Sequence, residues 1–271
     1  MTVAVEWSSI RGLLIDLDGV VYTGRDPITG SATFLKQARE HGLPFLLITN
    51  NSTTSPERVA ERLRAMDITV APQEVLTSAQ VAAAYVRDHS QPGARVRIVG
   101  EQGLRQAATE EGLRIVDDGD ATVDWVLAGL DRAFDYDKLT TATRAILAGA
   151  RFVATNADAL LPVEGGNVLP GAGSMVAAIQ TATAREPVVV GKPQPGLFQH
   201  GLQRLGSLKP HQAAMIGDRL DTDVVGGHRA GLRTILVLSG VTAPQQLAAA
   251  SQQPDAVVPN LAAVAALFDW R

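Results

Sequence analysis

Two aspartates separated by one residue, Asp16 and Asp18, follow the apolar run at residues 13–15. Side chains two positions apart on an extended chain point to the same side, so we expect both carboxylates to face one spot where a strand ends. Open α/β sheets bind their ligands at that carboxyl end of the strands. A strand end followed by an ordinary turn is the alternative, because Asp and Gly are common turn formers.

Three further polar clusters each come directly after an apolar run that has the composition of a buried strand. The first cluster contains Thr49, Asn50 and Asn51, and the second contains Lys192. The third contains Asp218 and, five residues later, Asp223. A loop is the ordinary interpretation of each cluster alone. Because a parallel sheet brings the carboxyl ends of its strands to one edge, we expect the clusters to meet there.

Asp16, Asp18 and Asp218 would repel one another at such an edge. Two unit charges about 4 Å apart interact by about 4 kcal/mol at an effective dielectric constant of roughly 20, so three carboxylates need a cation. Oxygen ligands without a His or Cys partner indicate Mg²⁺, which usually completes its shell with waters and a substrate phosphate. Lys192 adds positive charge, and the Thr49 hydroxyl with nearby amides can hold phosphate oxygens. Together, the cation, Lys192 and Thr49 could bind an anionic phosphoryl group.

Asp16 and Asp18 can divide the work of phosphoryl transfer. One carboxylate attacks phosphorus and forms an aspartyl-phosphate. The other protonates the leaving oxygen and then takes a proton from the water that hydrolyses the intermediate. The metal and Lys192 would offset charge on the transferring group. These residues alone leave open which carboxylate has which role.

Apolar runs alternate along the chain with amphipathic stretches. The predicted strands are residues 12–15, 44–48, 96–99, 123–128, 150–154, 188–190, 213–216 and 234–238. The predicted helices are residues 56–66, 103–111, 137–147, 196–205 and 221–230. Such alternation predicts βαβ units and parallel sheets, whose strands are buried on both faces and therefore form continuous apolar runs.

Two segments that contain proline, residues 70–78 and 182–187, have the character of domain boundaries. The roughly one hundred residues between them alternate strands and helices of their own, which is enough for an inserted domain. We therefore predict an α/β fold in which residues 1–78 and 187–271 form a Rossmann-like parallel-sheet core. Residues 79–186 form a large inserted α/β cap in this prediction.

Composition excludes several classes of function. The net charge is −4, aromatic residues make up 4% and no basic block stands out, so nucleic acid is not an expected partner. The chain has no cysteine, which excludes disulfides and thiolate metal sites. No signal peptide is recognisable, and no apolar stretch is long enough for a membrane span. These features predict a soluble, cytoplasmic protein with no membrane partner.

The ordered clusters resemble the four motifs of haloacid dehalogenase (HAD) superfamily phosphatases. More narrowly, they resemble subfamily IIA, which includes NagD-like, 4-nitrophenylphosphatase-like and pyridoxal phosphate phosphatase-like enzymes. The matching stretches are Asp16-Leu-Asp-Gly-Val20, Thr49-Asn-Asn51, Lys192 and Gly217-Asp-Arg-Leu-Asp-Thr-Asp223. Residues 149–158 and 170–174 resemble the cap of this subgroup, so the similarity covers nearly the whole chain.

The resemblance implies a role for each acidic residue of the motifs. Asp16 would be the nucleophile and a metal ligand. Asp18 would be the general acid/base and would also bind Mg²⁺ through its backbone carbonyl. Asp218 would be the other carboxylate ligand. Asp223 would lie behind the ligands and orient a metal-bound water or Lys192, with an ordinary residue at a helix start as the alternative.

The resemblance also implies which residues contact the substrate. Thr49 and Lys192 would bind the phosphoryl group, with Asn50 and Asn51 beside it. Two residues of the cap, Asn156 and Asp158, would lie in a loop that faces the substrate, and ordinary turn residues are the alternative. A homodimer formed through the cap is a further implication.

The predicted function is therefore Mg²⁺-dependent hydrolysis of small phosphorylated metabolites, with aryl phosphates as substrates in vitro. Sugar phosphates, glycerol phosphate, phosphoglycolate, nucleotides and pyridoxal phosphate all remain open as substrates. A phosphotransferase or mutase on the same core is one alternative. A non-catalytic protein that binds phosphorylated metabolites is the other, and its signature would be loss of Asp16, Asp18 or Lys192.

Overall fold

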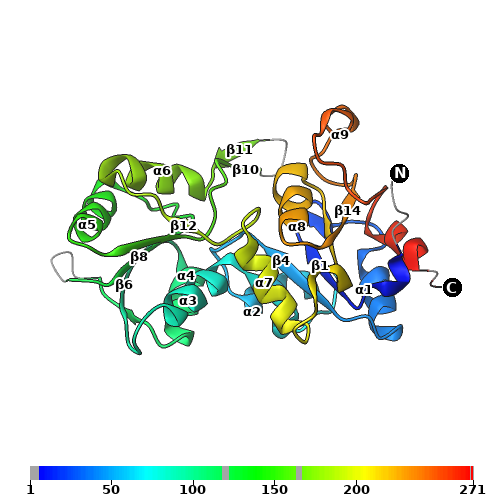
Figure 1. The fold of residues 1–271 in the computed structure, drawn as a ribbon, viewed down its shortest axis with the longest axis horizontal. Coiled ribbons are helices and arrows are strands. Elements are labelled where there is room, and N and C mark those ends of the chain that lie inside the picture. Colours follow the sequence, from blue (N-terminus) through cyan, green and yellow to red (C-terminus); the bar gives the residue numbers. More distant parts are fainter. Residues whose placement is uncertain (1–5, 118–121, 163–166, 269, 271) are drawn as a thin grey trace. The chain divides into compact units, whose positions relative to one another are not determined.

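The computed structural model describes residues 6–117, 122–162, 167–268 and 270, which fold into two compact units (Figure 1). Unit 1 consists of Met1–Thr49, Ala60–Leu76 and Lys192–Arg271. Unit 2 consists of Asn50–Val59 and Thr77–Gly191, so it contains the predicted cap, residues 79–186, together with shorter flanking segments.

The sheet of unit 1 has six strands in the order β15-β14-β13-β1-β4-β5. Their bounds are Ala256–Val258 (β15), Arg233–Val237 (β14), Ala213–Gly217 (β13), Gly12–Asp16 (β1), Phe45–Thr49 (β4) and Val75–Thr77 (β5). The strands from β15 through β4 pair in parallel. Every residue of β1, β4 and β13 is buried, as expected for parallel strands covered on both faces.

The order of the strands reverses at β1. The chain first adds β4 and β5 on one side of β1, and later adds β13, β14 and β15 on the other side. Ligands of open α/β sheets bind outside the strand ends at such a reversal. The register aligns Asp16 with Ile48 and Ile15 with Ile216, which brings the ends of β1, β4 and β13 to one edge.

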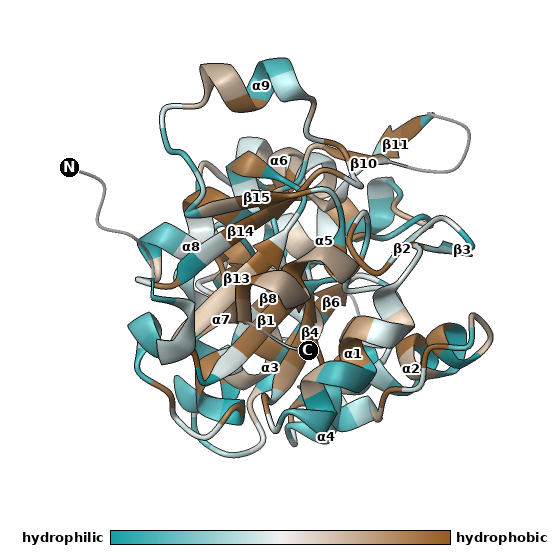
Figure 2. Ribbon diagram, turned by 90° about the vertical axis from the view of Figure 1, so that its right-hand side faces the viewer, coloured by the Kyte–Doolittle hydropathy of each residue, from teal (hydrophilic) through white to brown (hydrophobic). Residues whose placement is uncertain are grey.

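Helices cover this sheet, which Figure 2 shows as a band of apolar strands among more polar helices. They include α1 (Ser31–Glu40), α7 (Pro195–Arg204), α8 (Val225–Arg229) and a 3-10 helix, Leu261–Phe268. Helix α9 (Pro244–Ala249) buries no residue, and α2 (Pro56–Arg64) begins in unit 2 and ends in unit 1. A Cβ at Gly201 of α7 would lie 2.7 Å from Leu14 of β1, and one at Gly227 of α8 would lie 2.7 Å from Thr234 of β14. These glycines allow α7 and α8 to pack closely on the sheet.

Unit 2 has its own parallel sheet in the order β12-β9-β8-β6-β7. The bounds are Val188–Val189 (β12), Arg151–Ala154 (β9), Trp125–Ala128 (β8), Arg95–Val99 (β6) and Arg114–Ile115 (β7). The helices are α3 (Ser78–Asp88), α4 (Gln102–Glu110), α5 (Tyr136–Leu147) and α6 (Ala172–Thr183), and β10 (Leu160–Pro162) pairs with β11 (Val168–Pro170). Phe152 of β9, Ile146 of α5 and Ile179 of α6 share one buried apolar cluster.

The predicted α/β fold with an inserted α/β region is confirmed, and each predicted strand is present to within two residues at its ends. The predicted helix at residues 221–230 is a π-helical turn, Leu220–Val224, followed by the short α8. Helices α1, α3 and α6 were not predicted. Among the described residues, no helix is both long and apolar enough to cross a membrane.

Candidate active site

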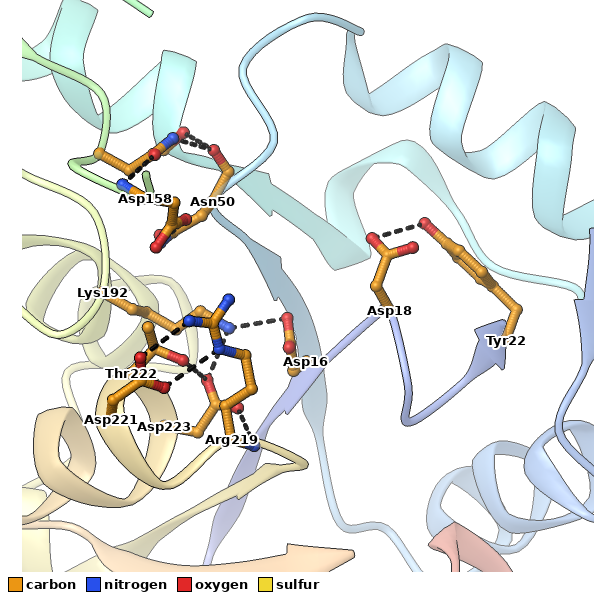
Figure 3. Close-up of polar contacts among 12 residues, drawn as sticks. Asp16, Asp18, Tyr22, Asn50, Asp158, Lys192, Arg219, Asp221, Thr222 and Asp223 are labelled. Carbon is orange, nitrogen blue, oxygen red and sulfur yellow. Dashed lines mark hydrogen bonds and ion pairs between the residues drawn. The ribbon is translucent and has the colours of Figure 1, made fainter. Parts of the chain in front are cut away.

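Lys192 joins two carboxylates at the end of β1. Its Nζ lies 2.7 Å from Oδ1 of Asp16, the last residue of that strand, and 2.8 Å from Oδ1 of Asp223 (Figure 3). The lysine is only 3% exposed and Asp223 only 1%. Burial alone would lower the pKa of Lys192, but Asp16 and Asp223 together raise it above its ordinary value. The ammonium group therefore keeps its charge.

Three buried carboxylates meet around this ammonium group. Asp16, Asp218 and Asp223 each offer an oxygen, and these oxygens lie within 4.8 Å of one another. Asp218 accepts a hydrogen bond from the Val241 amide through Oδ2 at 2.8 Å. Its Oδ1 is buried without a hydrogen-bond partner among the described residues. Three carboxylates, one ammonium group and an unsatisfied buried oxygen fit a bound divalent cation.

The pKa values of the cluster reflect this excess of negative charge. Burial, reinforced by the nearby Asp223 carboxylate, raises the pKa of Asp218 to about 6. Burial also raises the pKa of Asp16 well above its ordinary value; Lys192 opposes the change, whereas Asp223 and Asp218 add to it. Without a further positive charge, the folded protein therefore disfavours full ionisation of the cluster.

Glycines let the backbone approach these carboxylates closely. A Cβ at Gly240 would lie 1.9 Å from Asp218 Oδ2, and one at Gly19 would lie 2.4 Å from the same atom. Gly19 also has a φ of +79°, which glycine adopts most readily. A Cβ at Gly217 would lie 2.3 Å from the Asp223 carboxyl. Any side chain at these positions would displace the carboxylates.

The segment after β14 completes the surroundings of Asp218, although none of its residues was among the predicted site residues. Besides the Val241 amide, the Thr242 hydroxyl donates to the Asp218 carbonyl at 2.6 Å, and the Ser239 hydroxyl donates to the Gly19 carbonyl at 2.8 Å. The signal was available, because residues 239–242 directly follow a predicted strand of the same sheet.

The π-helical turn after β13 positions Asp223. The Arg219 amide donates to Asp223 Oδ2 at 3.1 Å, and the Thr222 hydroxyl donates to Oδ1 at 3.3 Å. Asp221 of the same turn instead pairs with the Arg219 side chain at 2.8 Å, and its own side chain is largely exposed. π-Helical turns occur frequently at functional sites.

The Asp18 carboxylate does not join the cluster, so the expectation that it faces the same spot as Asp16 is wrong for its side-chain orientation. Strand β1 ends at Asp16, and the alternation of an extended chain does not continue to Asp18. The carboxylate instead accepts a hydrogen bond from the Tyr22 hydroxyl at 3.2 Å. Figure 3 shows it pointing at Tyr22 and away from Asp16.

The protein around Asp18 also alters its acidity. Desolvation raises the pKa of Asp18, although the residue as a whole is exposed. The Arg62 guanidinium, the hydrogen bond from Tyr22 and the Lys192 charge each act in the opposite direction. A raised pKa suits a group that must carry a proton during part of a catalytic cycle.

Thr49 and the two asparagines that follow it lie in different units. Thr49 is buried at the end of β4 in unit 1, whereas Asn50 and Asn51 begin a segment of unit 2. The Asn51 Oδ1 accepts hydrogen bonds from the Thr53 amide and hydroxyl, both at 2.8 Å. The Asn51 side chain therefore closes a local turn.

Asn156 and Asp158 form a hydrogen-bond network with Asn50 inside unit 2. The Asn50 amide group donates to Asp158 Oδ2 at 3.0 Å, and the Asn156 amide group donates to the Asn50 carbonyl at 2.8 Å. The Ser78 hydroxyl donates to the same carbonyl at 2.6 Å. These bonds fix the point where unit 2 begins after Thr49. A substrate-facing role for Asn156 and Asp158 stays a prediction.

Comparison with known proteins assigns the family. The family model for haloacid dehalogenase-like hydrolases matches residues 13–114, and a HAD-hydrolase-like model matches residues 189–264. The chain is 43% identical over 244 residues to an acid sugar phosphatase from Staphylococcus haemolyticus, covering 90% of this chain and 91% of that protein. The chain thus belongs to the haloacid dehalogenase-like hydrolases.

Solved structures of related phosphatases share the fold. A glycerol phosphate phosphatase from Mycobacterium tuberculosis, crystallised with magnesium, is 40% identical with a TM-score of 0.86, covering 94% of this chain and 76% of that chain. A 4-nitrophenylphosphatase from Thermotoga maritima is 32% identical with a TM-score of 0.90, covering 97% and 99%. Within its family, this chain is a phosphoric monoester hydrolase of subfamily IIA.

Proposed function

We propose that this protein is a Mg²⁺-dependent phosphatase that hydrolyses small phosphorylated metabolites through an aspartyl-phosphate on Asp16. The unsatisfied, buried Oδ1 of Asp218, beside two more carboxylates and a single ammonium group, carries the proposal. A cation that prefers oxygen ligands would satisfy that oxygen and balance the charge. The magnesium bound by the M. tuberculosis relative supports the same ion here.

The ion would be held by the carboxylates of Asp16 and Asp218 and by the backbone carbonyl of Asp18. When bound, Mg²⁺ offsets negative charge on the phosphoryl oxygens. Asp223 would not be a ligand in this scheme. Its oxygens already accept from Lys192, the Arg219 amide and Thr222, so it orients the lysine.

The two aspartates of β1 and its following loop would perform the chemistry in turn. Asp16 attacks phosphorus, and the bond between phosphorus and the leaving oxygen breaks while Asp18 gives that oxygen a proton. Asp18 then removes a proton from a water that attacks phosphorus, and the bond to Asp16 breaks to release phosphate. Lys192 lies 2.7 Å from Asp16, so its charge favours the ionised nucleophile and would also bind the phosphoryl group.

The remaining predicted residues would bind and select the substrate. Thr49 would hold phosphoryl oxygens from the end of β4, with Asn50 and Asn51 beside it. Residues 79–186, which lie in unit 2, would act as the cap that chooses the leaving group and excludes water. The names of the relatives favour sugar phosphates, glycerol phosphate and aryl phosphates as substrates.

Phosphate release from a panel of phosphorylated metabolites and 4-nitrophenyl phosphate, measured with Mg²⁺, tests this function. We expect turnover that EDTA abolishes and added Mg²⁺ restores. Asp16→Asn should still fold, which cooperative thermal unfolding would show, and should lose turnover on every substrate. Asp221→Asn, which changes an exposed aspartate of the same motif, is the matched control and should stay active. Turnover that survives in Asp16→Asn would contradict the nucleophile, and turnover in EDTA would contradict the metal.

A further inference from the structure

The loop after β1 folds back so that Tyr22 lies beside Asp18. The Leu17 carbonyl accepts hydrogen bonds from the amides of Val21 and Tyr22 at 2.8 Å and 3.3 Å. The Gly19 amide donates to the Tyr22 carbonyl at 2.8 Å. These bonds close a short ring of backbone, which fixes the Tyr22 backbone next to that of Asp18.

The Tyr22 side chain is held firmly within unit 1. The residue is 3% exposed, and the Arg62 guanidinium lies over its ring, 4.4 Å from the centroid. Arg62 also donates a hydrogen bond to the Gly24 carbonyl, which anchors the guanidinium itself. An ordinary phenol is protonated at neutral pH, so the Tyr22 hydroxyl is a hydrogen-bond donor.

Asp18 is the exposed member of this pair. Its Oδ2 accepts from the Tyr22 hydroxyl at 3.2 Å, whereas Oδ1 has no hydrogen bond within the part of the chain that the structure describes. A rigid donor thus holds one oxygen of the carboxylate and leaves the other available. Catalytic acids and bases are commonly oriented in this way by a third group.

We propose that Tyr22 is a positioning residue for proton transfer, holding Oδ2 of Asp18 so that Oδ1 carries the proton to the leaving oxygen. The inference rests on the proposed general acid/base role of Asp18. The proton moves from Asp18 Oδ1 to the leaving oxygen as the bond to phosphorus breaks, and Tyr22 keeps its own proton throughout. Arg62 supports this arrangement through its contact with the Tyr22 ring.

Leaving groups of different basicity provide the test. An alkoxide needs a proton in order to depart, whereas 2,4-dinitrophenolate departs without one. kcat/KM reports the steps up to departure of the leaving group, so it isolates the first proton transfer from hydrolysis of the phosphoenzyme. The alkyl phosphate should be one that the wild-type enzyme hydrolyses in the metabolite panel.

We expect Tyr22→Phe to lower kcat/KM for the alkyl phosphate about tenfold, which is part of the 10²–10⁴-fold that a general acid usually supplies. For 2,4-dinitrophenyl phosphate the change should stay within about twofold, since that reaction needs no acid. Tyr136→Phe, which removes a hydroxyl from a residue that is 81% exposed, should change neither value. Equal losses on both substrates, or no loss on the alkyl phosphate, would overturn the inference.

The same measurement in an Asp18→Asn background separates the inference from the function on which it rests. Asp18→Asn alone should show a larger loss on the alkyl phosphate than on the dinitrophenyl ester, and adding Tyr22→Phe should cause no further loss. If Asp18→Asn shows no dependence on the leaving group, the proposed role of Asp18 fails. If Asp18→Asn shows that dependence on the leaving group, but adding Tyr22→Phe lowers kcat/KM for the alkyl phosphate by a further factor, only the role of Tyr22 fails. Wild-type thermal unfolding of Tyr22→Phe would exclude a folding defect.

Discussion

Removing the charge of Asp218 should stabilise the protein in the absence of metal, although the substitution should abolish activity. Asp218 is 2% exposed and lies within 4.8 Å of two other carboxylates. Asp218→Asn keeps the shape of the side chain, which matters because the backbone of Gly19 and Gly240 packs against it. The carbonyl oxygen of the new side chain can still accept from the Val241 amide, and its NH₂ group would take the place of Oδ1, which is buried without a hydrogen-bond partner among the described residues.

The size of the effect follows from the pKa of Asp218, which is raised from 3.8 to about 6. The shift is about two units, and each unit corresponds to 1.36 kcal/mol, so ionisation of Asp218 costs the folded state about 3 kcal/mol above pH 6. Because a raised carboxyl pKa makes the folded state bind more protons than the unfolded state, the cost shrinks as the pH falls below 6 and vanishes near 3.8. Allowing for imperfect hydrogen bonds of the new amide, we expect a gain of about 2 kcal/mol at pH 7.5.

Urea unfolding in EDTA and in Mg²⁺, at pH 7.5 and pH 5, measures these differences. In EDTA at pH 7.5 the variant should be more stable than wild type, and at pH 5 its advantage should be smaller. Mg²⁺ at about one hundred times its dissociation constant should stabilise wild type by about 2.7 kcal/mol. The variant should gain much less, because it has lost a charged ligand. Asp221→Asn, with an exposed side chain, is the control and should change little under any condition.

Two results would refute this reasoning. If Asp218→Asn is less stable than wild type in EDTA at pH 7.5, the carboxylate is not held at an electrostatic cost. If Mg²⁺ stabilises the variant as much as wild type, Asp218 is not a ligand of the ion.

Two further substitutions test the contacts around the site. Lys192→Met should destabilise the metal-free protein by about 3–5 kcal/mol in urea unfolding, because Asp16 and Asp223 would lose the ammonium group that both contact. Equal stability of this variant and wild type would show that the ammonium group is dispensable for folding. Asp158→Ala should lower the free energy of unfolding by about 1 kcal/mol, since the Asn50 amide group loses its acceptor. An unchanged thermal unfolding midpoint would show that this hydrogen bond does not help to fix the start of unit 2.

Much of the fold could be predicted because parallel strands buried on both faces need long apolar runs. β1, β4 and β13 are such runs, and each is followed at once by polar residues that the sheet brings to one edge. Helix α3 was not predicted because its sequence is rich in alanine, and few polar residues distinguish an exposed face from a buried one. Its capping box was visible nevertheless, with Thr77 accepting from the Gln80 amide and the Gln80 side chain accepting from the Thr77 amide.

Other parts of the site could not be predicted because they depend on the backbone rather than on the type of side chain. Val241 contributes only its amide to Asp218, and nearly any residue could do so. Gly240 is required because its backbone approaches the Asp218 carboxylate, and that approach exists only once β14 is placed beside β13. The hydrogen-bond network around Asn50 does depend on side chains, but it could not be predicted because it joins residues more than one hundred positions apart in the chain.

The spacing of Asp16 and Asp18 led us to expect both carboxylates at one spot, which is wrong for the Asp18 side chain, and the difference bears on the proposed chemistry. Asp16 is the last strand residue, buried at 8% exposure and held by Lys192, which suits a nucleophile that must meet phosphorus from a fixed direction. Asp18 lies beyond the strand and is exposed, with one neutral hydrogen bond to Tyr22. An acid/base that serves first a leaving oxygen and then a water needs such freedom at one oxygen. Strand β1 ends between these residues, so the carboxylate of Asp16 is fixed by the strand and Lys192, whereas the carboxylate of Asp18 can adjust.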